Sequence, residues 1–408
     1  YIIEHECKVK SFVKGTFDEK RILVELDKIC AKTSSNLTLK GLLFGVNDII
    51  NVDGYPTRCG SLLPHELFNG LQASCVSKLL NAGAIFAGKT VTAEFAVSDP
   101  GETRNPRNLS HTPGGSSSGS AASVAAGFCD IAIGTQTSGS VIRPAGYCGT
   151  IGYKPSFGRI SRDGVLLFSN SMDHIGICAK DLNLLEKTLP LLVNSGSFWK
   201  PKINRNISIG VPLGSYINLS KPAILQQFFN IVQLLKAKFH VNNFELVKDI
   251  NRYNRKIDDI SSAELYKVHA VWYERYKELY GPEVSKTIEA GKNIDPYDLT
   301  LLIKKSKQDR QFLQKLMMDK GIDIWIAPVA PDVAPFGIDS TGDFSMNSIW
   351  SYTGLPVITI PTGVNQINLP YSIQIVGRCG EDEKLLQISK VIEECLKIPP
   401  LLNSWELN

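Results

Sequence analysis

Two loops rich in glycine and serine, residues 113–127 and 134–145, constrain the fold of this chain more than any other feature. They lie in a longer segment, residues 112–164, whose composition shifts sharply towards these two residue types. A flexible linker of that composition would not contain "AASVAAG" and "DIAIGT", which have the character of a buried helix and a buried strand. We therefore predict a folded glycine- and serine-rich centre rather than a spacer.

Apolar runs of strand length recur along the chain, and segments with helical periodicity separate them. The strand-like runs are 42–46, 84–90, 206–212, 322–328, 355–363 and 372–377. The helical segments are 221–239, the charged and aromatic stretch 263–320, and 383–396. Strands that alternate with helices along the whole length are typical of an α/β fold with a largely buried sheet. We find no internal repeat and no clean domain boundary.

Composition narrows the class of protein. The net charge of +4 comes without a basic stripe, which argues against nucleic acid as the partner, and no apolar run is long enough to span a bilayer. Nine scattered cysteines without a CxxC pair indicate reduced thiols of a cytoplasmic protein, and six histidines without ligand spacing argue against a metal site. Because the chain begins at Tyr1 rather than methionine, the sequence leaves open whether a targeting segment precedes it.

The two loops permit three functions. Small residues let backbone N–H groups point into a cleft, where they can bind phosphate or stabilise an oxyanion next to a serine nucleophile. Neither of the two loops contains GxxxxGK[ST] or a GxGxxG turn, which disfavours phosphate binding by these loops. The remaining alternative is that the glycines only permit close packing.

The residues of this centre carry a family resemblance. "GGSSSGSAASVAAG" and "GTQTSGSVIRPAGYCGTIGYKPSFGRIS" resemble the signature region of the amidase signature family of serine hydrolases. Further segments resemble the family in order, at 52–61, 82–96, 104–108, 171–182, 354–363 and 373–382. The resemblance implies one large α/β domain over residues 1–408, with a mixed β-sheet flanked by α-helices. Residues 112–164 would be its signature core. The helical periodicity of 263–320 makes that segment a candidate excursion that covers the substrate site.

The resemblance also implies a Ser–cis-Ser–Lys triad. The nucleophile would be Ser140, and the bridging serine, held by an unusual cis peptide bond, would be Ser116. The oxyanion donors would be the backbone N–H groups of residues 137–140, namely Thr137, Ser138, Gly139 and Ser140. Gln136 belongs to the same substrate-binding loop and stands where aspartate is frequent. Serines replace glycines at Ser118 and Ser138, which are mild departures because backbone donors depend little on the side chain.

The position of the triad lysine is the strong departure. "LLFGVNDIINVDG" aligns with the family on Val46, Asp48 and the turn at Asp53, which puts Asn47 in the place of the lysine. A buried neutral lysine takes the proton from the bridging serine, whereas an asparagine amide can only hydrogen-bond Ser116 and hold it in place. Removing one general base typically costs on the order of 10²–10⁴ in rate.

Three explanations follow from Asn47. The chain is a variant made to trap a substrate, a homologue that kept binding and lost hydrolysis, or an enzyme for activated acyl groups such as esters and thioesters. We expect an acyl hydrolase or acyl transferase that acts on a carboxamide or related C–N bond through an acyl-enzyme on Ser140, impaired by Asn47. The alternative is an inactive binding or scaffold protein with an amidase fold.

The expected partner is a small-molecule amide or acyl compound, with neither nucleic acid nor a membrane. The resemblance implies no cofactor, and a homodimer or an accessory-protein role stays open.

Five other residues are candidates for a role. Lys89 and Lys154 lie in family-like segments, but the resemblance gives neither a catalytic role. Arg143 is predicted to form a structural ion pair. Trp350 and Tyr352 are candidates to line an acyl pocket.

Overall fold

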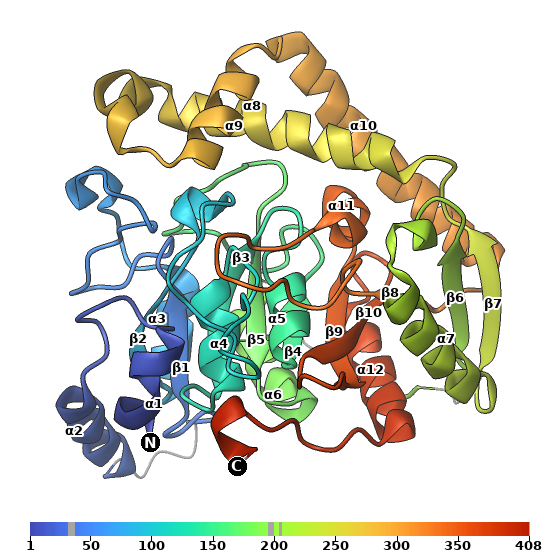
Figure 1. Ribbon diagram of the computed structural model, residues 1–408, viewed down its shortest axis with the longest axis horizontal. Helices are drawn as coiled ribbons and strands as arrows, with labels where there is room; N and C mark the ends of the chain where they lie inside the picture. Colours follow the sequence, from blue (N-terminus) through green and yellow to red (C-terminus); the bar gives the residue numbers. More distant parts are fainter. Residues whose placement is uncertain (32–36, 195–199, 204–205, 408) are drawn as a thin grey trace.

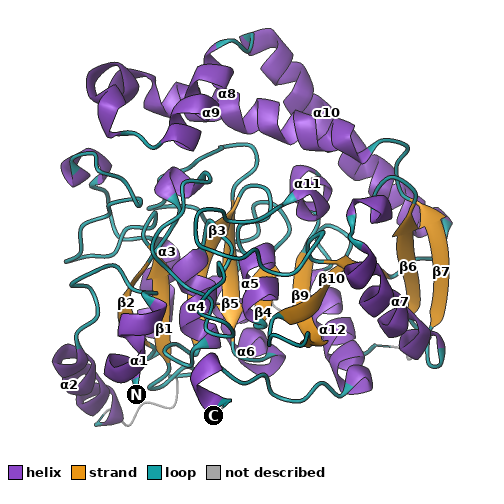
Figure 2. Ribbon diagram, in the orientation of Figure 1, coloured by secondary structure: helices purple, strands orange, loops and turns teal. Residues whose placement is uncertain are grey.

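A ten-stranded β-sheet runs through the whole molecule (Figures 1 and 2). The computed structural model describes residues 1–31, 37–194, 200–203 and 206–407. The order of the strands is β2-β1-β3-β5-β4-β9-β10-β8-β6-β7. Their bounds are β1 Leu43–Asn47, β2 Ile85–Thr90, β3 Ile131–Gln136, β4 Ile151–Lys154, β5 His174–Ala179, β6 Ser208–Leu213, β7 His240–Glu245, β8 Ile324–Pro328, β9 Val357–Val364 and β10 Pro370–Val376.

The sheet is mixed, as the resemblance implied. Parallel pairs lie at its two ends, where β1 contacts β2 and β3, and β6 contacts β7 and β8. The central strands β3, β5, β4, β9, β10 and β8 pair in antiparallel fashion. The predicted fold, one α/β domain with a mixed sheet flanked by helices, is confirmed.

Helices cover both faces of the sheet. Apolar side chains of α3, α6, α7 and α12 pack on one face, and those of α1, α2, α4 and α5 pack on the other. The bounds are α1 Ile2–Val9, α2 Glu19–Cys30, α3 Ser74–Asn81, α4 Ser118–Ala125, α5 Ile142–Cys148, α6 Leu182–Leu192, α7 Pro222–Lys236, α8 Ile250–Tyr276, α9 Pro282–Lys292, α10 Pro296–Asp319, α11 Ser345–Tyr352 and α12 Asp382–Leu396.

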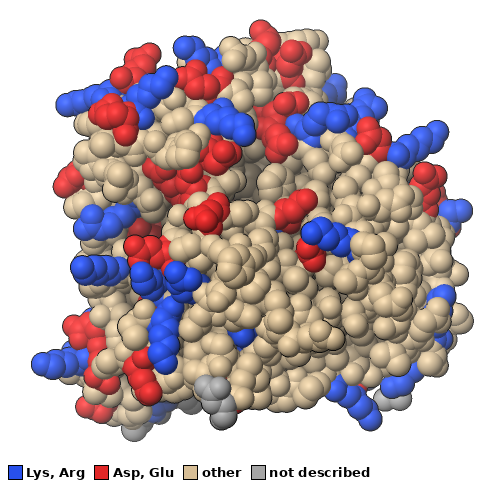
Figure 3. All heavy atoms as spheres, viewed as in Figure 1, with Lys and Arg blue, Asp and Glu red and all other residues tan. Residues whose placement is uncertain are grey.

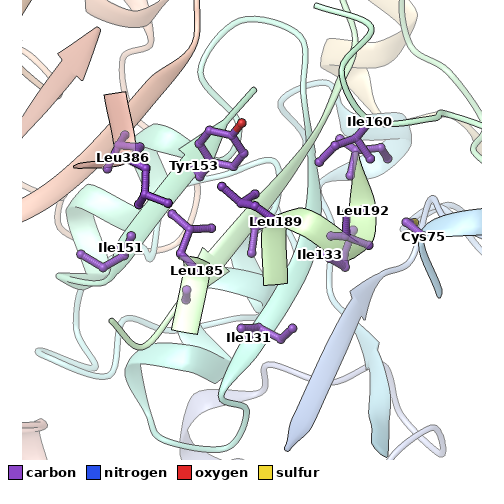
Figure 4. Packing of buried hydrophobic residues seen from close by; sticks show 14 of the residues in the cluster. Cys75, Ile131, Ile133, Ile151, Tyr153, Ile160, Leu185, Leu189, Leu192 and Leu386 are labelled. Carbon is purple, nitrogen blue, oxygen red and sulfur yellow. The ribbon is translucent and has the colours of Figure 1, made fainter. Parts of the chain in front are cut away.

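Strand β3 shows how the sequence builds this core. Its alternate residues Ile131 and Ile133 pack with Leu185 and Leu189 of α6, as Figure 4 shows. Between them, Ala132 faces the opposite side and packs with the alanines of α4. A small residue there lets α4 approach closely, so the glycine- and serine-rich centre is core material, as its composition predicted.

Helices α8, α9 and α10, which we call the helical cover, cross one end of the sheet at the top of Figure 1. The helical segment begins at Ile250, earlier than the predicted start at residue 263. Its first turns have helical spacing as well, because Ile250, Tyr253 and Ile257 are three and four residues apart, so the prediction began too late. Helices α9 and α10 each begin at a proline, after Gly281 and Asp295, where the fixed φ of proline suits the first turn.

Three strands were not among the predicted runs. Strand β7 lies at the edge of the sheet and most of its residues are exposed, so it lacks an apolar run. Strands β4 and β5 are fully buried but short and interrupted by Gly152 and Gly176. Glycine weakens a strand pattern and is tolerated here because neighbouring side chains fill the space above it.

The surface and the thiols are ordinary for such a chain. On the face drawn in Figure 3, basic and acidic side chains are intermingled. None of the described helices combines the length and the apolar character that crossing a membrane requires. Five cysteines are buried, whereas Cys7 and Cys30 are exposed, and none of the nine forms a disulfide.

Candidate active site

A cavity of about 350 Å³ lies between the end of the sheet and the helical cover. Its floor is the turn 137–143 between β3 and α5, one wall is the segment 96–98 after β2, and the opposite wall is formed by α8 and α9. Phe168 and Phe344 add aromatic surface. Of the two glycine- and serine-rich loops, only the second lines this cavity.

Ser140 lies in the turn at the bottom of this cavity. It follows strand β3, and its residue is 8 % exposed. Within the described part of the chain, no acceptor is found for the backbone N–H groups of residues 137–140. Unpaired N–H groups beside a serine hydroxyl are what a developing oxyanion requires. This turn is compatible with the oxyanion role that the resemblance implies, and that role stays a prediction.

Gln136 holds that turn in shape. Its side-chain Oε1 accepts hydrogen bonds from the N–H groups of Val141 and Ile142, at 2.8 and 2.9 Å. Its Nε2 donates to the C=O of Ser138 and to Ser351 Oγ. An aspartate could accept the two N–H bonds but could not donate to Ser138, so glutamine suits this turn. The side chain lies outside the cavity lining, and Gln136 acts through the turn rather than on a ligand.

Ser116 lies behind Ser140. The peptide bond between Gly115 and Ser116 is cis, as expected for the bridging serine. The N–H of the next residue, Ser117, donates to the C=O of Ser140 at 3.1 Å, which joins the two loops. Ser116 is fully buried, and its Oγ has no hydrogen-bond partner among the described residues.

The neighbouring serines hold the loop in place through hydrogen bonds to backbone C=O groups. Ser117 Oγ donates to the C=O of Thr135, Ser118 Oγ donates to the C=O of Val91, and Ser120 Oγ donates to the C=O of Ile133. Ser116 is the exception in this run. A buried hydroxyl without a partner is costly, and such groups concentrate where function needs them.

Asn47 ends strand β1 and is fully buried. Its Oδ1 accepts the N–H of Ile49 at 3.1 Å, whereas its Nδ2 has no partner within the described residues. The expectation that Asn47 holds Ser116 by a hydrogen bond is therefore wrong, because its side chain is shorter than lysine and turns towards Ile49. Asn47 Nδ2 and Ser116 Oγ are thus two buried polar atoms without partners in the part of the chain that the structure describes.

The two residues are anchored to one segment of the chain. Asn47 is the register partner of Thr90 at the end of β2, and the C=O of Ser116 accepts the N–H of Ala93 at 2.9 Å. The side chain of Thr90 faces helix α4, because its Oγ1 lies 2.7 Å from the Oγ of Ser120 in that helix. Register partners on neighbouring strands direct their side chains to the same face of a sheet. Asn47 thus belongs to the face of the sheet on which α4 begins, two residues after Ser116.

Lys89 does not replace the missing lysine. It precedes Thr90, so strand alternation directs its side chain to the opposite face. There its Nζ lies 2.9 Å from Asp48 Oδ1 and 3.3 Å from Thr57 Oγ1, with all of the lysine side chain buried. Burial raises the pKa of the Asp48 carboxyl, while the Lys89 ammonium opposes that shift. The pair is structural.

The pKa of Lys154 would suit a general base, but its position in the structure does not. Burial lowers the pKa of its ammonium to about 7. Its Nζ donates to the C=O groups of Leu355 and Pro155, at 2.6 and 3.0 Å, and it is not part of the cavity lining. Because a base must reach the proton that it takes, Lys154 is excluded by geometry.

The buried Lys154 predicts a pH-dependent stability. Between pH 7 and its ordinary pKa of 10.5, the unfolded chain holds a proton that the folded chain lacks, so the free energy of unfolding rises with pH. We expect it to rise by up to about 1.4 kcal/mol per pH unit more steeply in this chain than in Lys154→Met. Urea denaturation at pH 7, 8 and 9 measures both slopes, and equal slopes would contradict the lowered pKa.

Three residues differ from their predicted roles. Among the described residues, Arg143 has no carboxylate within 4.0 Å; burial lowers its pKa, and its Nη2 donates to the C=O of Gly115 at 2.6 Å. Trp350 and Tyr352 do not line the cavity; both are buried and donate hydrogen bonds to other buried side chains. Their place on α11, inside the core, could not be read from the segment.

No pattern in the sequence identifies the residues of the helical cover that line the cavity. Asp258, Ser261 and Ser262 of α8 and Glu283 and Lys286 of α9 form its far wall. Burial, with Asp259 next, raises the pKa of the Asp258 carboxyl to about 6. Helical periodicity predicts helices in this segment, but it does not say which turns face a site in another part of the chain.

Comparisons with known proteins identify the family of this chain. The amidase family model matches residues 2–386. The chain is 30% identical to a glutamyl-tRNA(Gln) amidotransferase subunit of Alkaliphilus metalliredigens, over 97% of this chain and 91% of the relative. It is 27% identical to the corresponding protein of Lachnospira eligens, over 93% and 90%.

Solved structures show the same fold. A crystal structure of an amidase superposes with a TM-score of 0.86 at 26% identity, covering 96% of this chain and 93% of that one. Fatty acid amide hydrolase superposes with a TM-score of 0.87 over 97% of this chain and 80% of that one, but at 18% identity this shows the fold alone. The chain belongs to the amidase family, whose members act on amide C–N bonds.

Proposed function

We propose that this chain binds a carboxamide in the 350 Å³ cavity and forms an acyl-enzyme on Ser140, slowly because Asn47 stands where a base is needed. The observation that carries the proposal is the pair of unpartnered buried atoms, Ser116 Oγ and Asn47 Nδ2. We interpret them as the place of a proton relay through Ser116 that lacks its base, because an asparagine amide takes up no proton near pH 7.

The chemical step is an acyl transfer. A bond forms between Ser140 Oγ and the carbonyl carbon, and the C–N bond breaks. The proton of Ser140 must pass through Ser116 and reach the leaving amine, after which water hydrolyses the acyl-enzyme. The N–H groups of residues 137–140 would stabilise the oxyanion without help from Asn47. Activated esters, whose leaving groups need no proton, should therefore be better substrates than amides.

A second function is binding without turnover. Two of the relatives are named as subunits of an amidotransferase, which makes work within an assembly a reasonable role for an amidase fold with impaired chemistry. The missing base favours this function if Ser140 cannot be acylated at all. The acylation of Ser140 separates the two proposals.

Labelling with a fluorophosphonate, followed by intact mass spectrometry and peptide mapping, is the test. We expect one slow adduct on Ser140 in this chain and none in Ser140→Ala. An adduct only in Asn47→Lys would favour binding without turnover. If neither this chain nor Asn47→Lys forms an adduct at Ser140, although both bind a carboxamide ligand or fold as measured by circular dichroism, the acyl-enzyme proposal is wrong.

A further inference from the structure

Segment 93–99, which we call the strap, connects the candidate site with the helical cover. It includes a short 3₁₀ turn, Glu94–Ala96, which is the next element of the chain after β2. Its first residue, Ala93, donates its N–H to the C=O of Ser116 at 2.9 Å. Its residues 96–98 line the cavity. The strap therefore contacts both the buried serine and the space in front of Ser140.

Two carboxylates of the strap hold the start of helix α9. Glu94 Oε2 accepts the N–H of Gly281 at 2.7 Å. Asp99 Oδ2 accepts the N–H of Val284 at 2.9 Å, and its Oδ1 accepts that of Glu283 at 3.3 Å. Free N–H groups and the helix dipole make the first turn of a helix favourable for anions. The cap of α9 is thus supplied by a segment about 185 residues away in sequence.

The fit between the carboxylates and α9 is close. A Cβ atom added at Gly281 would lie 2.6 Å from an oxygen of Glu94 and 2.6 Å from an oxygen of Asp99. Glu94 is buried, and its Oε1 accepts the hydroxyl of Ser61, so its carboxylate has little room to move. Glycine at position 281 permits this contact.

The backbone of the strap is strained. Phe95 and Ala96 have φ values of 46° and 62°, in the left-handed region that side chains disfavour. The ring of Phe95 lies 4.4 Å from that of His269 in α8 and 5.6 Å from that of Tyr280, which precedes α9. Such a conformation persists only where the surroundings fix it, and here the helical cover shares that task with Phe68, whose ring centroid lies 5.4 Å away, and with the C=O of Cys59, which accepts the N–H of Phe95 at 2.8 Å.

We infer that the strap couples the position of the helical cover to that of Ser116, with Glu94 and Asp99 as positioning residues. Withdrawal of α9 from the carboxylates would release the strained Phe95-Ala96 pair. Since Ala93 is held by Ser116, the release would also loosen the loop that carries the serine. The inference rests on the proposed function in one respect, because it takes the cavity as the substrate site.

Hydrogen exchange of the full chain tests the coupling without any chemistry at Ser140. In Asp99→Ala we expect the amides of residues 281–287 to exchange about tenfold faster, as for loss of a helix cap. The peptides that contain residues 93–96 and 113–120 should become faster as well. Asp99→Asn keeps one acceptor oxygen, so the same amides should exchange faster by a smaller factor. This variant replaces Asp99→Ala in the experiment if Asp99→Ala does not fold.

Asp295→Ala is the matched control. Asp295 caps α10 of the same cover by accepting the N–H of Tyr297 at 2.7 Å, and its contact is local. Its loss should raise exchange only at the start of α10. If Asp99→Ala raises exchange in α9 but leaves residues 93–96 and 113–120 unchanged, Asp99 is an ordinary cap and the coupling is wrong.

A functional readout complements the exchange. Asp99→Ala and Gly281→Ala should each change the rate of Ser140 labelling by a fluorophosphonate, and Asp295→Ala should not. If no form of the chain labels at Ser140, the proposed function fails while the exchange experiment still decides the coupling. If labelling occurs and all three variants label at the same rate, the strap does not position the site.

Discussion

Replacing Asn47 with lysine is expected to raise the rate at which this chain hydrolyses an anilide by about 10²–10⁴-fold. The longer side chain can reach towards Ser116, whose Oγ lacks a partner among the described residues. Burial disfavours the charged ammonium, so the amine can take the proton of the serine. The measurement is the kcat/KM for release of the aniline from an acyl anilide.

Asn47→Met is the matched control for this prediction. Methionine has a similar length and cannot accept a proton near neutral pH, so it separates filling of the space from the supply of a base. We expect no gain in kcat/KM from Asn47→Met. An equal gain in both variants would show that packing around Ser116, rather than proton transfer, limits this chain.

The second large effect concerns Ser116. In the chain as it is, Ser116→Ala should change the anilide rate little, because the relay already lacks its base. In the Asn47→Lys background the same substitution should remove most of the gain, about 10²-fold or more, because members of a catalytic unit are strongly non-additive. The four kcat/KM values of this double-mutant cycle give the coupling directly.

Ser118→Ala is the control for the cycle. It removes the same hydroxyl two residues away, but the Oγ of Ser118 donates to the C=O of Val91 and has no place in the relay. Its effect should be the same in both backgrounds. A coupling of Ser116 with position 47 no larger than that of Ser118 would contradict the relay.

Much of the fold followed from local patterns. The strands at residues 85–90, 131–136 and 357–364 each begin with a short run of mostly apolar residues, and runs of this kind predict buried strands. Strand β7 could not be predicted, since it is polar and gains its place from pairing with β6 at the edge of the sheet. Pairing partners far apart in sequence leave no local signal.

Some features of the candidate site could also be predicted from the sequence, and others could not. The cis peptide bond before Ser116 agrees with the resemblance, and Ser140 lines the cavity, whereas the roles of both serines stay predictions. The bracing role of Gln136 and the contact of Arg143 with Gly115 depend on side-chain directions in a folded turn, which a sequence does not contain. The far wall of the cavity depends on how the helical cover lies across the sheet.

The rate of Ser140 labelling by a fluorophosphonate between pH 6 and pH 10, in this chain and in Asn47→Lys, tests the missing base most directly. In Asn47→Lys the rate should rise through a single ionisation below the ordinary lysine pKa of about 10.4, because burial favours the neutral amine. The chain with Asn47 should stay slower by at least about 10²-fold, without that ionisation. Equal rates and the same pH profile in both chains would show that another group is the base and would contradict the proposed role of Asn47.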